Sequence, residues 1–304
     1  MDFKTNIDPG REEKEEEKTV VFSGSYEDIP ENRKVEIPEG IVEISENAFR
    51  DFGNLEEITF PKSLEIVGPA AFSGCKNLRK VTFRFGVREL LDEAFAFCPA
   101  LTEVILPDSV KRIGEGTFEG CATLSKVKLS ESLETVGAGA FAFCFNLHDI
   151  TIPDSCYLVE FNAFASCFAL EFAKLSANMG LIDESTFEGC RSLAEVDLPG
   201  RLTKIGRRAF KGCTSLKQLI LPVGLREIGF DAFAGCSSLM RIAIPKGLAS
   251  VEDDDIFGAC DSLREISFGG NKEQWESLFH GKSVTVERSD CTICTPNITF
   301  LELK

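Results

Sequence analysis

The sequence predicts a repeat solenoid, β-rich, in which short parallel strands stack coil on coil. A phenylalanine returns every 23 residues, with the last one a residue late: Phe49, Phe72, Phe95, Phe118, Phe141, Phe164, Phe187, Phe210, Phe233 and Phe257. In nearly every unit a cysteine follows this phenylalanine by three residues, and a leucine follows the cysteine by three more. A fixed period of this size is typical of stacked-repeat proteins. One coil cannot bury its own apolar face, so neighbouring coils must cover it.

Each unit contains two extended segments. In the unit that begins at Leu101, Val104 and Leu106 recur as apolar positions, and their spacing of two is the pattern of a half-buried strand. A proline without a ladder N–H then ends the strand, and it stands at one repeat position in most units: Pro38, Pro61, Pro107, Pro153, Pro199, Pro222 and Pro245. A second extended segment runs from Val110 to Ile113, after which a Gly-x-x-Ala-Phe segment turns the chain back.

The array needs a cap at each end. We predict a charged, disordered tail over 1–19, an N-terminal cap over 20–34 with a short strand near Val21, an array over 35–268, and a C-terminal cap and tail over 269–304. In the C-terminal cap, Trp275, Leu278 and Phe279 are spaced to share one face of a short helix. We expect Trp275 to plug the last coil.

The composition excludes several classes of function. The chain has 49 acidic and 33 basic residues and a formal net charge of -16, so binding to nucleic acid lacks its usual electrostatic attraction. No run approaches the ~20 apolar residues that span a bilayer. The segment from Met1 to Val20 contains no apolar core of a signal peptide, so nothing in the chain as written directs export.

Ten of the 12 cysteines are explained by packing. Nine share one repeat position: Cys75, Cys98, Cys121, Cys144, Cys167, Cys190, Cys213, Cys236 and Cys260. Cys156 stands at a core-leucine position, and free cysteine is well suited to such small buried sites. Cys291 and Cys294 form a CxxC outside the array. We expect this pair to form a disulfide in the tail or to remain as two free thiols without a function. A metal or redox site is the alternative, although a zinc site would require two further ligands.

The residue pattern resembles a known repeat family. The run from Leu216 to Cys236 fits Leu-x-x-Ile-x-Leu-Pro-x-x-Leu-x-x-Ile-Gly-x-x-Ala-Phe-x-Gly-Cys almost completely. It is similar to the BspA-like, or treponemal-type, leucine-rich repeats of bacterial and protist surface proteins. This resemblance implies a right-handed, curved horseshoe, a role in adhesion or protein binding, and a place on the cell surface or outside the cell. Because the chain shows no export or anchor segment, a cytoplasmic location is the alternative.

The sequence offers no catalytic or cofactor motif. Its two histidines, His148 and His280, have no partner histidine at metal-ligand spacing, and no Gly-x-Ser-x-Gly elbow or glycine-rich phosphate loop occurs. The acidic run Glu252 to Asp255 lacks the alternating ligands and the glycine of a calcium loop, so we expect a solvated bulge there. We therefore expect no enzymatic activity and no bound cofactor or metal.

Phenylalanines off the 23-residue period supply the candidate site. Phe97 and Phe143 stand where five other units have glycine, Phe145 and Phe168 share another variable position, and Phe172 stands at the start of a strand. Because equivalent positions of successive coils lie side by side, Phe143, Phe145 and Phe168 should form one apolar patch. Such patches often mark interaction sites. The alternative is that these rings fold inward and fill gaps between coils.

The function that this sequence predicts is binding of a protein, for example a host or matrix protein, through the off-period phenylalanines. A structural role is the alternative, in which the repeats act as a spacer or assemble into a surface layer by self-association through the same patch. A redox protein that uses Cys291 and Cys294 is a third class.

Overall fold

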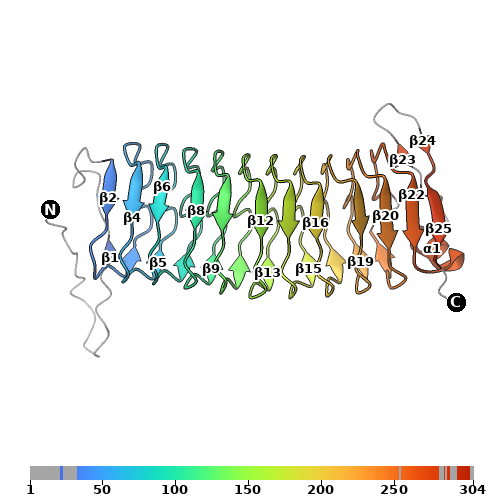
Figure 1. The fold of residues 1–304 in the computed structure, drawn as a ribbon, viewed down its shortest axis with the longest axis horizontal. Coiled ribbons are helices and arrows are strands. Elements are labelled where there is room, and N and C mark those ends of the chain that lie inside the picture. Colours follow the sequence, from blue (N-terminus) through green and yellow to red (C-terminus); the bar gives the residue numbers. More distant parts are fainter. Residues whose placement is uncertain are drawn as a thin grey trace.

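The computed structural model describes residues 21–22, 33–252, 255–280, 284, 286–287 and 293–301. The chain is a β-solenoid of about ten stacked turns with parallel strands and little helix. Figure 1 shows the coils following one another along a single axis, with β1 and β2 at one end and β25 and α1 at the other. The predicted repeat solenoid is confirmed.

Every coil contributes a strand to each of two parallel rows (Figure 1). The first row consists of β2 (Lys34–Glu36), β4 (Glu57–Thr59), β6 (Lys80–Thr82), β8 (Glu103–Ile105), β10 (Lys126–Lys128), β12 (Asp149–Thr151), β14 (Phe172–Lys174), β16 (Glu195–Asp197), β18 (Gln218–Ile220), β20 (Arg241–Ile244) and β22 (Glu265–Phe268). The second row consists of β1 (Val21–Phe22), β3 (Glu43–Ile44), β5 (Ile66–Val67), β7 (Glu89–Leu90), β9 (Arg112–Ile113), β11 (Thr135–Val136), β13 (Leu158–Val159), β15 (Leu181–Ile182), β17 (Lys204–Ile205), β19 (Glu227–Ile228) and β21 (Ser250–Val251).

The strands pair in the register of the repeat. Val104 lies opposite Val127 and Ile113 lies opposite Val136, so these residues pair with the equivalent residue 23 positions away. Since side chains alternate along a strand, the middle residue of β8, Val104, points into the core while its two neighbours face outward. Equivalent side chains of successive coils therefore form continuous rows, both inside and outside the solenoid.

The periodic phenylalanines form one stacked column in the core, which we call the spine. Consecutive rings from Phe49 to Phe257 stack with centroids 4.8 to 5.9 Å apart and with planes 5 to 17° from parallel. Each ring is 0 or 1% exposed. The backbone is paired there as well, since the Phe72 amide donates to the Ala94 carbonyl of the next coil at 2.8 Å. Ring packing and hydrogen bonding thus act together between coils.

The repeat cysteines are buried free thiols, as the sequence predicts. In each coil the thiol donates to the spine phenylalanine carbonyl of the preceding coil, for example from Cys121 Sγ to Phe95 O at 3.3 Å. Burial raises the pKa of Cys121 and of Cys167 to about 12 and that of Cys156 to about 11. Cys291 lies outside the described residues, and of Cys294 only the backbone is described, in β24 (Ile293–Cys294).

The C-terminal end is covered by a short helix. Helix α1 (Lys272–Leu278) is capped at its N-terminus by Asn271, whose side chain accepts from the Gln274 amide in a capping box. Trp275 is 4% exposed, and its ring meets the edge of Phe268 on the last array strand at a centroid distance of 5.3 Å. Trp275 also packs on Phe279 at 4.4 Å. The prediction that Trp275 plugs the last coil is confirmed.

Both ends also carry an added strand. The N-terminal strand β1 pairs in parallel with β3, as expected from the sequence near Val21. At the other end, β25 (Asn297–Phe300) pairs in parallel with β22, which the sequence did not predict. A hairpin of β23 (Val286–Glu287) and β24 precedes it. The predicted tail over 1–19 lies outside the described residues.

The buried thiols should make the protein sensitive to alkali. Burial raises the pKa of six of them: Cys121, Cys144, Cys156, Cys167, Cys190 and Cys213. The folded protein therefore keeps protons that the unfolded chain releases above about pH 8.5. The free energy of unfolding should be unaffected by these thiols below that pH and fall above it, by about 1.4 kcal/mol per thiol per pH unit.

Cys156→Leu is the matched control, because Leu133 and Leu202 occupy the equivalent position in other coils. Denaturant unfolding under reducing conditions, repeated from neutral pH to about pH 10.5, measures the slope. The variant should lose stability more slowly with rising pH, by about one thiol's share, or 1.4 kcal/mol per pH unit. Equal slopes for the two proteins would contradict this account.

Candidate functional site

Three of the five off-period phenylalanines lie together on the outside of the solenoid. The rings of Phe145 and Phe168 stack at a centroid distance of 4.9 Å and 11° from parallel. Phe143 meets Phe145 edge-on at 6.3 Å. Phe143 is 42% exposed and Phe145 is 37% exposed, and Phe168 is half-buried. We call these three residues the aromatic cluster.

A cation extends the aromatic cluster by one coil. The guanidinium carbon of Arg191 lies 4.5 Å from the centroid of the Phe168 ring. Phe145, Phe168 and Arg191 are 23 residues apart, so the stack Phe145–Phe168–Arg191 follows the same register as the spine inside. A guanidinium over a ring face is electrostatically favourable. The outer surface therefore carries a short stack of three planar groups, parallel in register to the spine inside.

The backbone at Phe143 is left-handed, with a φ of 60°. This conformation belongs to the repeat, because the equivalent residues of other coils include Gly120 (68°) but also Phe97 (55°) and Ser166 (59°). It costs a residue with a Cβ about 1 kcal/mol. Several coils therefore carry the same strain, and it does not by itself mark Phe143 for function.

The other two predicted residues lie apart from the aromatic cluster. Phe97, which is 52% exposed, packs its ring against Gly120 of the next coil, where an added Cβ would come within 2.6 Å of the ring. Phe172 is half-buried on β14, between Asp149 and Glu195 of the neighbouring strands. Among the described residues, neither ring stacks on the other candidate phenylalanines. Of the five candidate phenylalanines, the structure brings together Phe143, Phe145 and Phe168, the three that were expected to form one patch.

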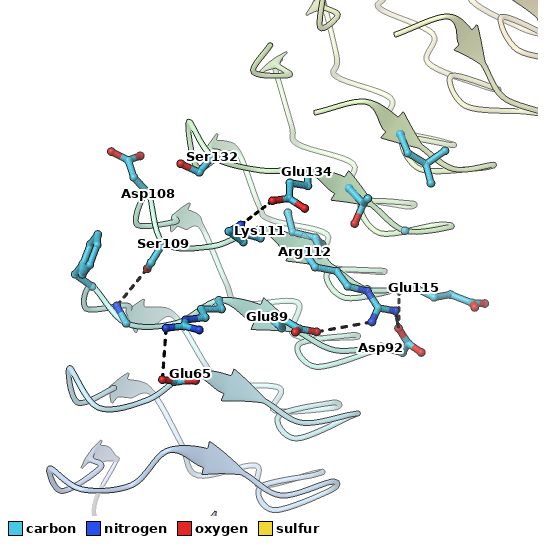
Figure 2. Close-up of a pocket in the computed structure, with 18 of the residues that line it drawn as sticks. Glu65, Glu89, Asp92, Asp108, Ser109, Lys111, Arg112, Glu115, Ser132 and Glu134 are labelled. Carbon is cyan, nitrogen blue, oxygen red and sulfur yellow. Dashed lines mark hydrogen bonds and ion pairs between the residues drawn. The ribbon is translucent and has the colours of Figure 1, made fainter. Parts of the chain in front are cut away.

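A trough of about 1090 Å³ runs along the second strand row. Figure 2 shows that its walls are charged and that the charges pair between coils. Its ion pairs join Arg88 to Glu65 at 3.8 Å, Arg112 to Glu89 at 3.8 Å and to Asp92 at 3.9 Å, and Lys111 to Glu134 at 2.8 Å. Exposed pairs of this kind contribute little stability. The lining as a whole has four basic and seven acidic residues, so the trough stays negative despite these pairs.

The sequence analysis missed this trough. Its signal is the alternation of sign at positions 23 apart, such as Glu89 and Arg112 or Lys111 and Glu134. Two exposed aromatic residues, Phe85 (72%) and Tyr157 (59%), also line it. Whether the surface is hollowed at these residues depends on how neighbouring coils are positioned in space, and the repeat pattern does not reveal this.

The described residues contain no group of three or more histidine, cysteine or acidic side chains suited to hold a metal ion. In the acidic run after Val251, Glu252 pairs with Arg207 at 3.3 Å, whereas Asp253 and Asp254 lie outside the described part of the chain. No helix in that described part is long and apolar enough to cross a bilayer.

The stacked coils and their parallel strand rows define a leucine-rich-repeat solenoid. Comparison with known proteins identifies the family to which it belongs. The model of the BspA type leucine-rich repeat region matches residues 42–171 and 158–285. The chain therefore belongs to the family of BspA-type leucine-rich repeat proteins, as the resemblance in the sequence indicated.

Solved structures share the architecture. A leucine-rich repeat protein of T. pallidum, TpLRR, has a TM-score of 0.50 and 25% identity, and the match covers 70% of this chain and 87% of that one. The pneumococcal vaccine antigen PcpA has a TM-score of 0.54 and 21% identity, with 89% of this chain and 80% of that one covered. No curated protein matches the sequence.

We expect the aromatic cluster to contribute little to stability. Two half-exposed rings bury about half of what core rings bury, so Phe145→Ser/Phe168→Ser should lower the free energy of unfolding by about 1–2 kcal/mol. Denaturant unfolding followed by circular dichroism measures this difference. A loss of about 4 kcal/mol or more would show that the rings belong to the core.

Proposed function

We propose that this chain is a non-enzymatic protein-binding module that uses the aromatic cluster as its anchor. Membership of the leucine-rich repeat family indicates an interaction or adhesion scaffold. The observation that carries the finer proposal is the exposed stack Phe145–Phe168–Arg191 beside Phe143, on a chain whose spine is complete without it. The partner is a protein, such as a host or matrix protein, met at the cell surface or outside the cell.

The chemistry of the aromatic cluster supports this proposal. Aromatic rings and arginine are enriched among the few residues that supply most of the binding energy of protein interfaces. The stack already holds its side chains in place, so little conformational entropy is lost when a partner covers it. Elsewhere the outward side chains are mainly charged, which keeps the uncovered protein soluble.

The second candidate function is a structural one, in which the aromatic cluster of one copy packs on another copy. The same residues support it, since an apolar patch can bind itself. A spacer without a partner needs no distinctive patch, so its outward residues can be similar in every coil. The rings of the aromatic cluster instead occur on successive coils near the middle of the array.

The test compares retention of proteins on three immobilised baits. These are the unaltered chain, Phe145→Ser/Phe168→Ser, and a matched control, Ile220→Ser/Val223→Ser, which removes two residues that are 77% and 84% exposed far from the aromatic cluster. Host-cell and matrix extracts are applied and bound proteins are quantified by mass spectrometry. We expect at least one protein to be retained by the unaltered chain and the control, and to fall about tenfold on the cluster variant.

Equal retention by all three baits would contradict the proposal. Light scattering on the three purified bait proteins tests the second candidate function, which is self-association. A dimer or larger assembly that dissociates only in Phe145→Ser/Phe168→Ser would favour self-association over binding of a foreign partner.

A further inference from the structure

A small hollow opens directly beside the aromatic cluster, and we call it the notch. It holds about 380 Å³, and Phe143 of the aromatic cluster forms part of its wall. Its floor is made of small residues, Ala138, Gly139, Ala142 and Ala165. At the positions equivalent to Ala138 and Ala142, the preceding coil carries Glu115 and Glu119. The coil of Phe141 thus has alanine at two positions where the preceding coil has glutamate, and the notch lies at these smaller side chains.

Two phenylalanine rings stand in the wall of the notch. Phe143 is 42% exposed and Phe161 is 48% exposed. Phe161 occupies the position of Ala138 in the preceding coil and Glu184 in the following one, and the sequence analysis did not select it. Exposed ring faces attract cations through their quadrupoles. The notch thus offers two such rings next to a hollow.

Three carboxylates complete the wall, from Glu115, Glu119 and Glu188. None of them forms an ion pair with a described residue, although Glu188 accepts a hydrogen bond from Ser185 Oγ at 2.6 Å. Figure 2 shows Glu115 at the edge of the trough, with its carboxylate directed away from the ion pairs of Arg112. In the trough, basic side chains pair with part of the acidic lining, whereas the charged residues that line the notch are all acidic.

The negative charge in the notch is unfavourable as it stands. Burial, and after it the nearby carboxylates of Glu93 and Glu115, raise the pKa of Glu119. Glu93, like the residues of the notch, has no ion-pair partner among the residues described. A cation placed between these carboxylates would relieve their repulsion and form charge-assisted hydrogen bonds.

We propose that the notch receives a lysine or arginine side chain from a basic segment of the protein partner, next to the surface that the aromatic cluster covers. This inference rests on the proposed function and specifies the chemistry of the partner. Charge complementarity selects the occupant, because an apolar or acidic segment would desolvate the carboxylates without pairing them. The net charge of -16 attracts a basic segment from a distance.

The N-terminal segment of the chain is not suited to the notch. Segment 1–19 contains seven acidic and four basic residues, so it is repelled overall by the notch. A foreign basic segment meets no such repulsion. The occupant is therefore assigned to the partner and not to this segment.

The test observes the floor of the notch directly. In protein labelled at alanine methyl groups, the NMR signals of Ala138, Ala142 and Ala165 report on the notch, and the exposed Ala177 and Ala249 report on surface elsewhere. The probes are the peptides acetyl-Gly-Lys-Lys-Gly-amide and acetyl-Gly-Gln-Gln-Gly-amide. We expect the lysine peptide to shift the three floor signals with saturation, and the glutamine peptide to leave them in place.

Two variants separate a specific site from general attraction. Glu115→Gln/Glu119→Gln should weaken binding of the lysine peptide about tenfold. Glu36→Gln/Glu171→Gln removes the same charge at exposed positions outside the notch and should leave the affinity within about twofold. Unmoved floor signals, equal shifts at Ala177 and Ala249, or equal weakening by both variants would overturn the inference.

The outcome is separable from that of the proposed function. If Phe145→Ser/Phe168→Ser loses the retained protein while Glu115→Gln/Glu119→Gln keeps it, the protein-binding proposal stands and the notch is not its cation site. If the lysine peptide binds in the notch but no protein depends on Phe145 and Phe168, the anchor role of the aromatic cluster is wrong.

Discussion

The structure depends on the contact between one coil and the next at an offset of 23 residues. No coil has an interior of its own, since the ring of Phe118 is covered by Phe95 on one side and Phe141 on the other. The same offset pairs the backbone amides and places each thiol under a carbonyl of the preceding coil. Because every coil uses the same contact, an altered coil changes the fit of both its neighbours.

This constraint also organises the outer surface. Residues 23 apart become neighbours whether or not they are buried, so the ion pairs of the trough, the stack of Phe145 on Phe168, and the pairing of β14 with β12 all follow one rule. Core positions have little freedom, because a wrong residue there disturbs three coils. Outward positions are free to vary, and it is there that the chain can acquire a binding surface without altering its fold.

The repeat made most of the fold predictable. The spine, the thiol column, the two strand rows and the Trp275 plug all follow from residue types at fixed spacing. Strand β25 did not, because Asn297–Phe300 lies beyond the last unit and its pairing with β22 is set by an open edge that only the folded array presents. The contact between Phe145 and Phe168 was predictable for the same reason as the spine.

The notch was not predictable in this way. Searching for added aromatic residues finds Phe143 but not the hollow beside it, which lies at the small side chains of Ala138 and Ala142. Phe161 also stands at a position whose residue type varies from coil to coil, so the consensus gives no background against which it would be noticed. A search for runs of small residues at outward positions would have found the floor.

Native-state hydrogen exchange of a Phe141→Ala variant, read along the array by mass spectrometry, tests most directly whether coil-to-coil contact holds the molecule together. Removing a core phenylalanine costs about 3–5 kcal/mol. If stability comes from neighbour contacts, amide protection should fall most in the coils of Phe118, Phe141 and Phe164 and recover gradually toward both ends. Loss of protection confined to the coil of Phe141, with unchanged neighbours, would contradict the account.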